Sequence, residues 1–172
     1  SIPAFPAPKN FKGKLFDYQH AGLNWLRFLH DSEFSGLLAD DMGVGKTIQT
    51  LCFLLSLQAE NKEKDQPRCS LLVAPRSLVN NWQREAAKFA PDLKVLPHWD
   101  GKRGDDPEVF KKYDLVITTY GIMRQDIGWL EAHPFHYVIL DESQVIKNPT
   151  SESFKAARHL RSRKRLCLTG TP

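Results

Sequence analysis

The chain has 172 residues, of which 41% are hydrophobic and 26% charged, a balance typical of one globular domain. Its formal net charge of +4 is well mixed along the chain, so the charge permits nucleic acid as a partner without arguing strongly for it. No run reaches the roughly 18 apolar residues of a membrane span, and the first residues lack the basic flank and apolar core of a signal peptide, so no membrane partner is expected.

The three cysteines are an odd number and show no Cys-x-x-Cys spacing. Cys52, Cys69 and Cys167 all lie among apolar residues. We therefore expect buried free thiols in a reducing compartment rather than disulfides or a metal site.

The chain is expected to begin with an extended arm, residues 1–12, because its closely spaced prolines disfavour a helix. Residues 13–172 are expected to form one domain.

The first predicted helix covers residues 17–30, where apolar residues recur at helical spacing, with Asp17 as the N-cap. Gln19 lies in the first turn, and its amide offers both a donor and an acceptor to an adenine edge, although most glutamines at helix starts are simply solvated. The expected inner stripe of this helix is Tyr18, Gly22, Trp25, Leu26 and Leu29.

A glycine-containing loop stands between a short apolar run, residues 36–39, and an apolar helical pattern, residues 47–57. This order of strand, loop and helix is typical of a phosphate cradle, because glycine lets backbone N–H groups turn inward and the helix N-terminus attracts anions. Asp40 stands where the usual pattern has its first glycine, and the alternative is a glycine turn with a solvated lysine. Lys46 is expected to contact the outer phosphates, and the Thr47 hydroxyl to bind Mg²⁺. The predicted phosphate-binding residues are Asp41, Met42, Gly43, Val44, Gly45, Lys46 and Thr47.

The rest of the chain alternates short apolar runs with helical patterns. A charged surface loop is expected at residues 60–68, and Ser77 is expected to cap the helix that follows Pro75. The alternation predicts an α/β fold, a mostly parallel sheet with helices on both faces. The predicted strands are residues 70–74, 94–98, 114–118, 135–140 and 165–168, and the predicted helices are residues 77–89, 122–129 and 154–160.

Three further polar segments leave alternatives open. Arg76, Ser77 and Asn81 follow a strand and so lie at the ligand-binding edge of a parallel sheet, but ordinary capping and solvation explain them equally well. The aspartates of the loop at residues 99–107 lack the ladder of carboxylates that a metal site needs. The basic run at residues 158–165 suits either a nucleic-acid backbone or, as we prefer, a solvated helix end.

Two acids, Asp141 and Glu142, come directly after the apolar strand at residues 135–140. Neighbouring side chains at a strand end point in different directions, so one acid can face a metal ion held by Thr47 and the other the outer phosphate. We expect Asp141 to hold Mg²⁺ and Glu142 to orient and deprotonate the attacking water, with Lys46 on the phosphates. A pair of surface acids is the alternative, but a pair placed about ninety residues after a phosphate loop favours nucleotide hydrolysis.

Taken together, these segments resemble the helicase motifs of the Swi/Snf-type branch of helicase superfamily two. Leu15-Phe16-Asp17-Tyr18-Gln19 resembles the Q motif, residues 38–49 motif I, residues 73–78 with Asn81-Trp82 motif Ia, residues 117–120 motif Ib, residues 140–148 motif II, and residues 168–172 motif III. The aspartate at position 40 is the family's residue there.

The resemblance implies a RecA-like three-layer first lobe that hydrolyses ATP with Mg²⁺ when bound to double-stranded DNA, in proteins that move along the duplex and remodel what is bound to it. The family's second lobe, with its arginine finger, is absent from this chain, so we expect the lobe alone to be nearly inactive. Gln19 would meet adenine. The positions implied to face DNA or to couple nucleotide to DNA are Arg76, Ser77, Asn81, Thr119, Tyr120, Gln144, Thr169 and Thr171.

Two residues depart from the family's commoner pattern. Asp41 replaces a glutamate, and Gln144 replaces a histidine. The glutamine resembles the bacterial members of the family.

The expected location is the nucleoid in a bacterium or the nucleus in a eukaryote. The alternatives are an RNA helicase lobe, which the loop at residues 40–43 and Trp82 disfavour, and a nucleotide-gated interaction module without turnover. A P-loop kinase lacks support, because neither an acceptor pocket nor a lid is recognisable.

Overall fold

The computed structural model describes residues 2–31, 36–39, 45–64, 68–143 and 150–169. Within these ranges strands alternate with helices along the chain, as the sequence predicts. The elements are α1 (Asp17–Asp31), β1 (Gly36–Ala39), α2 (Lys46–Lys64), β2 (Ser70–Ala74), α3 (Val79–Phe89), β3 (Val95–His98), the 3-10 helix η1 (Pro107–Lys112), β4 (Leu115–Thr119), α4 (Tyr120–Leu130), β5 (Pro134–Leu140), α5 (Glu152–His159) and β6 (Arg161–Thr169).

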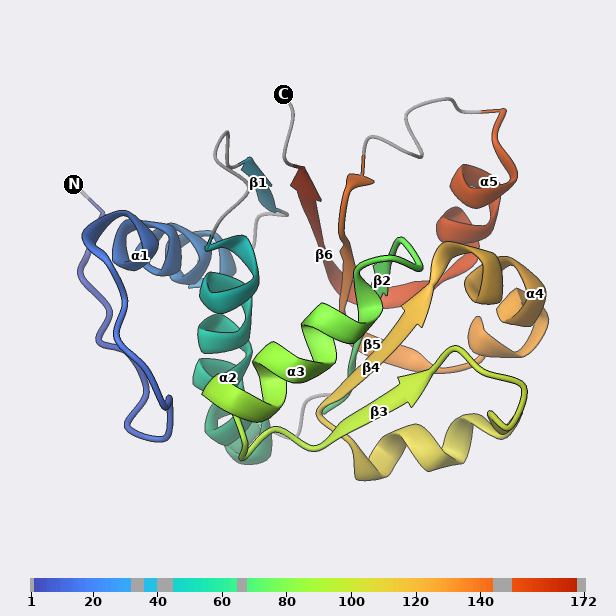
Figure 1. Ribbon diagram of the computed structural model, residues 1–172, viewed down its shortest axis with the longest axis horizontal. Helices are drawn as coiled ribbons and strands as arrows, with labels where there is room; N and C mark the ends of the chain where they lie inside the picture. The colour runs from blue at the N-terminus through green and yellow to red at the C-terminus, as the bar shows by residue number, and fades with distance from the viewer. Residues whose placement is uncertain (1, 32–35, 40–44, 65–67, 144–149, 170–172) are drawn as a thin grey trace.

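The strands form one six-stranded sheet in the order β1-β6-β5-β2-β4-β3, and every described pairing is parallel (Figure 1). The central strands are short apolar runs because helices cover both of their faces. In register, Leu72 of β2 lies beside Ile117 of β4 and Ile139 of β5. Parallel pairing brings all strand C-termini to one edge, where polar loops follow the strands.

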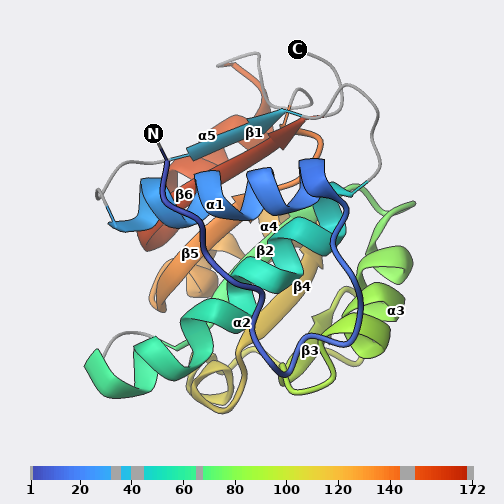
Figure 2. The same ribbon diagram turned by 90° about the vertical axis from the view of Figure 1, so that its left-hand side faces the viewer.

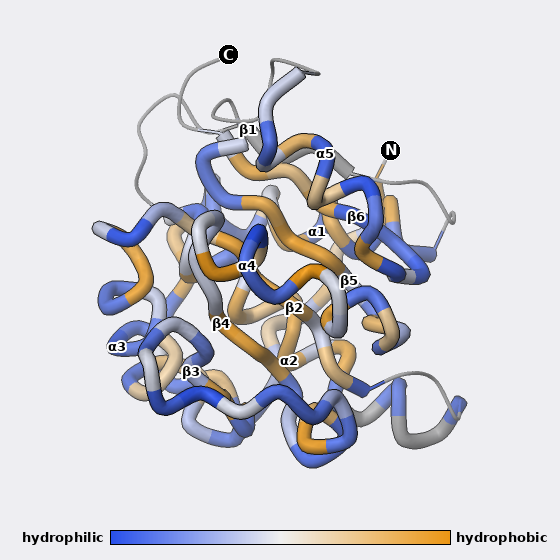
Figure 3. The backbone as a smooth tube through the Cα atoms, turned by 90° about the vertical axis from the view of Figure 1, so that its right-hand side faces the viewer, coloured by the Kyte–Doolittle hydropathy of each residue, from blue (hydrophilic) through white to orange (hydrophobic). Residues whose placement is uncertain are grey.

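Alternate residues of each strand face opposite layers. Leu72 and Ile139 pack in one core beneath α1, α2 and α3, whereas Leu71 and Val138 pack in a second core against η1, α4 and α5. Figure 1 shows α1, α2 and α3 on the left of the sheet and α4 and α5 on the right. Figure 3 shows that the apolar residues gather along β2, β4 and β5, between the two helical layers. The predicted α/β fold with helices on both faces is confirmed.

The arm packs along α1 and α2 (Figure 2). The backbone N–H of Phe5 donates to Asn24 Oδ1 at 2.7 Å, and the Arg27 guanidinium lies over the Phe5 ring. At the far end of the arm Phe11 is buried in the core and stacks on Phe89. The arm is thus extended and without helix, and its aromatic residues attach it to the domain.

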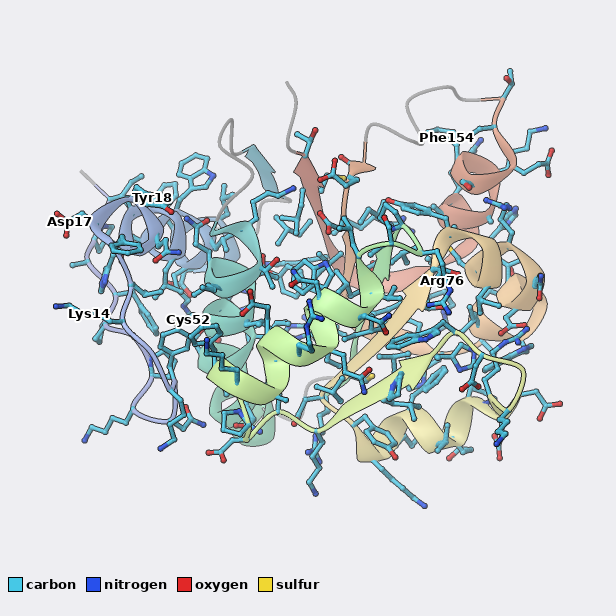
Figure 4. All side chains as sticks on the ribbon, viewed as in Figure 1. Lys14, Asp17, Tyr18, Cys52, Arg76 and Phe154 are labelled. Atoms are coloured by element: carbon cyan, nitrogen blue, oxygen red, sulfur yellow. The ribbon has the colours of Figure 1, made fainter. Side chains whose placement is uncertain are left out.

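The predicted inner stripe of α1 is wrong in part. Tyr18, labelled in Figure 4, is 42% exposed and Trp25 is 37% exposed, whereas Gln19 and Leu23 are buried. Tyr18 and Trp25 share helical spacing with the buried Leu26, but the packed face is rotated towards positions 19, 23 and 26 because α2 and the sheet edge lie on that side. The helix also includes the predicted N-cap Asp17, so it begins one residue earlier than expected.

Three further local predictions are wrong. The expected loop at residues 60–68 begins as helix, because α2 continues to Lys64 and Glu60 is held by Arg27 at 2.9 Å and Lys64 at 2.9 Å. Ser77 does not cap α3, whose N-cap is Leu78 without a side-chain bond. The basic run is divided, since α5 ends at His159 and residues 161–165 begin β6, where parallel pairing with β5 overrides their polarity.

The cysteines are free, and Cys52 and Cys69 are buried as predicted, while Cys167 is half-buried. Burial raises the pKa of Cys52 to about 12 and also raises the pKa of Cys69. In the described part of the chain no helix is both long enough and apolar enough to cross a membrane.

His136 is the third residue of β5 and lies among the polar residues His30, Glu60 and Asn61 of α1 and α2. Its Nδ1 lies 3.0 Å from Asn61 Nδ2, and its ring packs edge-on against His30. Burial lowers the pKa of His136 to about 4, and the neighbouring His30 and Arg163 act in the same direction. The fold therefore holds this imidazole neutral.

We expect acid to destabilise the domain through His136. The folded pKa is below the unfolded value of about 6.5, so the stability it contributes is complete above pH 6.5 and is lost as the pH falls towards 4. Between pH 7 and pH 5 this loss is about 2 kcal/mol. Urea unfolding at both pH values should show a smaller difference for His136→Gln than for the wild type, while His159→Gln at an exposed position keeps the wild-type difference. Equal differences in all three proteins would contradict this origin.

Candidate active site

Two polar segments meet at the carboxyl edge of the sheet. Lys46 begins α2, which comes after β1, and Asp141 and Glu142 directly follow β5. Since β1 and β5 both flank β6, these segments emerge close together. The Lys46 Nζ lies 3.4 Å from Asp141 Oδ1 and 3.2 Å from Glu142 Oε1. The structure thus joins the predicted lysine with both predicted carboxylates.

Three neighbours hold Asp141 in place, two through its carboxylate and one through its main-chain carbonyl. The indole Nε1 of Trp82 donates to Asp141 Oδ2 at 2.8 Å, and the backbone N–H of Glu142 donates to Asp141 Oδ1 at 2.9 Å. The Tyr120 hydroxyl donates to the main-chain carbonyl of Asp141 at 2.7 Å. Burial raises the pKa of Tyr120, and the charge of Asp141 adds to this effect, so the hydroxyl keeps the proton that it donates.

The positions of these neighbours follow from the sheet order. Val73 of β2 pairs with Leu140 of β5, so α3, which follows β2, places Trp82 over the end of β5. Tyr120 follows β4, the other neighbour of β2. The sequence places Trp82 in the segment that resembles motif Ia, but nothing in the helical spacing shows where its N–H points. Its place in a helix that directly follows a strand, at the ligand-binding edge of the sheet, is the sequence feature that could have indicated this role.

Glu142 adopts a left-handed backbone conformation with φ of 51°. This region is uncommon for residues other than glycine and asparagine, and a residue held there costs of the order of 1 kcal/mol or more. The surrounding contacts maintain it, since the Glu142 N–H is bonded to Asp141 and its side chain to Lys46. Such strain is concentrated at functional sites, which favours a functional role for this glutamate.

Charge and donor chemistry at the site suit a divalent cation with phosphate. Lys46, Asp141 and Glu142 together carry one net negative charge, and the side chains of Lys46 and Asp141 are only 7% and 5% exposed. Buried charges are costly unless they are paired or bind an ion. Carboxylate oxygens and the nearby hydroxyl of Thr47, in the first turn of α2, are the hard oxygen ligands that Mg²⁺ prefers. The residues present therefore fit a magnesium nucleotide.

The first turn of α1 reaches the same place. The backbone N–H of Phe16 donates to Gln19 Oε1 at 2.8 Å, one half of a capping box, and this contact orients the buried Gln19 amide. Gly45 has φ of +98°, and a Cβ at this position would lie 2.9 Å from Gln19 Nε2 and 3.2 Å from Tyr18 Cε2. Only glycine fits here, so the end of the loop lies directly against the predicted adenine-reading residue.

The other predicted positions are placed as follows. Arg76 and Ser77 are exposed after β2, with Arg76 labelled in Figure 4, and Asn81 is half-buried on α3. Thr119 is buried, and its Oγ1 accepts from the N–H of Ile122 as the N-cap of α4, while Thr169 is buried at the end of β6. Tyr120 is buried as well, so the structure gives Thr119 and Tyr120 internal contacts, and contact of any of these residues with DNA stays a prediction. Outside the described residues lie Asp40, Asp41, Met42, Gly43, Val44, Gln144 and Thr171.

Comparison with known proteins gives one consistent result. The sequence profile of the SNF2-related domain matches residues 18–172. The chain belongs to the SNF2 family. It is 39% identical to the putative ATP-dependent helicase/translocase YwqA of Bacillus subtilis, with 100% of this chain and 19% of YwqA covered. It is also 39% identical to the ATP-dependent helicase FUN30 of Saccharomyces cerevisiae, with 97% of this chain and 16% of FUN30 covered.

A solved structure supports the assignment of this chain to the SNF2 family. The SWI2/SNF2 ATPase core of Sulfolobus solfataricus in complex with double-stranded DNA superimposes with a TM-score of 0.83 at 36% identity, over 98% of this chain and 35% of that chain. The predicted RecA-like fold and family are confirmed. The relatives matched here are SNF2-family helicases and chromatin-remodelling ATPases, so the RNA helicase alternative is not supported. The SNF2 domain spans about a fifth or less of the relatives named above.

Proposed function

We propose that this chain is the ATP-binding and ATP-hydrolysing first lobe of a double-stranded DNA translocase that remodels protein–DNA complexes. The observation that carries the proposal is the contact of the buried Lys46 with Asp141 and Glu142, at 3.4 and 3.2 Å, where the start of α2 meets the end of β5. Membership of the SNF2 family supports the same reading of this site.

Each residue of the site has a separate role in phosphoryl transfer. Lys46 neutralises the outer phosphates, and Gln19 offers its amide to the adenine edge. Thr47 and Asp141 would hold a magnesium ion, which would neutralise phosphate charge. Trp82 keeps the Asp141 carboxylate in place, and Glu142 orients the attacking water and accepts its proton. We expect residues 41–45, of which only Gly45 lies within the described residues, to bind the phosphates as well.

Two partners complete the proposed activity. Double-stranded DNA runs along the edge that carries Arg76, Ser77 and Asn81, and it is the ligand of the Sulfolobus core whose fold this chain shares. The second partner is a second RecA-like lobe of the same full-length protein, in keeping with relatives several times longer than this chain. Its arginine finger would supply the part of the catalytic site that the first lobe lacks. The place of action is then the nucleoid of a bacterium or the nucleus of a eukaryote.

Binding of Mg-ATP to the 172-residue chain tests the proposal. We expect weak but saturable binding, followed by isothermal titration calorimetry, and a loss of roughly tenfold or more in affinity for Lys46→Ala, because a charge-assisted contact to phosphate is removed. Lys64→Ala, at an exposed position on the same helix, should bind as the wild type does. We also expect negligible turnover by the lobe alone and DNA-stimulated turnover by the full-length protein.

The outcomes separate the alternatives. Rapid DNA-stimulated turnover by the 172-residue chain alone would contradict the need for a second lobe. Ordinary ATP affinity without turnover by the full-length protein on any nucleic acid would replace the translocase with a nucleotide-gated interaction module. Absence of any Mg-ATP binding, in lobe and full-length protein alike, would overturn the assignment of the site.

A further inference from the structure

The second turn of α1 and the first turn of α2 meet at a single glycine. A Cβ at Gly22 of α1 would lie 2.6 Å from both Cδ and Oε1 of Gln49 and 2.9 Å from its Nε2. Atoms do not approach this closely without displacement, so the Gln49 amide occupies the space that a side chain at position 22 would need. A glycine inside a helix costs up to about 1 kcal/mol relative to alanine, and here it makes room for the amide of the neighbouring helix.

Gln49 itself is buried, with 4% of the residue exposed. It lies three residues after Lys46, and its backbone N–H closes the first turn of α2 on the Gly45 carbonyl at 2.9 Å. Its side-chain Nε2 lies 3.5 Å from the Tyr18 carbonyl, and its Oε1 has no hydrogen-bond partner within the described residues. A buried amide that is incompletely bonded is unfavourable for stability, so stability alone does not account for a glutamine at this position.

A second contact joins the first turn of α1 to the start of α2. The backbone at Gly45 packs against Gln19 and Tyr18, at distances that leave no room for a side chain. The turn of α1 that carries Gln19 is therefore held to the start of α2 at two points, Gly45 and Gln49. The proposed base-reading residue and the phosphate-binding lysine consequently lie on segments that pack directly against each other.

We propose that Gln49 is a positioning residue, seated against Gly22, that fixes the distance between the base-binding turn of α1 and the phosphate-binding turn of α2. This proposal rests on the proposed function, since it assumes that a purine nucleotide spans the two turns. Gln49 does not touch the reacting atoms. Its role is to let the base and the triphosphate of one nucleotide be bound at the same time.

The test compares a whole nucleotide with its phosphate part. Affinities for Mg-ATP and for Mg-tripolyphosphate are measured by calorimetry for the wild type, Gly22→Ala, Gln49→Ala and the double variant. In Gly22→Ala the new methyl group displaces the Gln49 amide, so we expect ATP affinity to fall at least fivefold while tripolyphosphate affinity stays within twofold. The double variant should be no weaker for ATP than Gln49→Ala alone, because the methyl group then occupies vacated space and the two effects do not add.

Matched controls keep the outcomes distinct. Gly128→Ala makes the same change in α4, where a Cβ would meet nothing within 4 Å, and should bind both ligands as the wild type does. Melting temperatures of all variants show whether each is folded. Equal losses for ATP and tripolyphosphate, additive losses in the double variant, or unchanged ATP binding in Gly22→Ala would each overturn the proposal. Failure of the wild type to bind ATP would instead overturn the proposed function.

Discussion

Glu142→Gln is expected to lower the ATP turnover of the full-length protein by about 10²–10⁴-fold, the usual contribution of a positioned general base. Glutamine keeps the shape of the side chain and its backbone at φ of 51°, but it cannot accept the proton of the attacking water. Mg-ATP affinity should stay within about threefold, because Lys46 and Asp141, 3.4 Å apart, remain in place. The measurement is phosphate release under saturating DNA, together with nucleotide binding by calorimetry.

Glu152→Gln supplies the matched control, since it makes the same chemical change on α5, where the carboxylate side chain is 79% exposed. Its turnover should equal that of the wild type. Should Glu142→Gln keep turnover within threefold of the wild type, the general base would have to be another group. Should it lose nucleotide binding as well, Glu142 would be a binding residue rather than a base.

Trp82→Phe is expected to lower turnover by about 10–100-fold, the equivalent of the roughly 1.5–3 kcal/mol that a hydrogen bond to a charged group contributes. Phenylalanine retains much of the buried apolar contact but removes the N–H that holds Asp141 Oδ2 at 2.8 Å. A carboxylate freed in this way samples orientations that do not hold Mg²⁺ at the phosphates. Because the metal acts in the chemical step, kcat should fall more than the KM for ATP rises.

If Trp82 positions Asp141, the turnover of Trp82→Phe should depend on the Mg²⁺ concentration, whereas a role in packing alone predicts no such dependence. Turnover of Trp82→Phe should be partly restored by raised Mg²⁺ concentration, whereas a variant that is merely destabilised shows no such recovery. Trp129→Phe, in the other core, is the control for loss of an indole and should keep its kcat. A lower melting temperature with unchanged kcat for Trp82→Phe would assign the residue to packing alone.

Much of the fold follows from short-range patterns. The apolar runs at residues 70–74 and 135–140 become β2 and β5, because strands covered on both faces need uninterrupted apolar residues. Parallel strands bring their C-terminal loops together, so Lys46 and the Asp141–Glu142 pair were expected to meet, and they do. The wrong predictions concern details of single helices: the buried face of α1, the end of α2 and the cap of α3. The buried face of α1 and the end of α2 depend on contacts with residues that are distant in sequence.

By itself, then, the sequence determined the α/β class, the family and the residue types of the site, since periodicity and the spacing of polar residues after strands are encoded locally. Only the tertiary structure decided that the Trp82 N–H holds Asp141, that Glu142 adopts a left-handed conformation, and that Gln49 is seated against Gly22. Those contacts join segments separated by tens of residues, and their geometry depends on strand order and helix rotation. A one-dimensional pattern of apolar and polar residues contains neither.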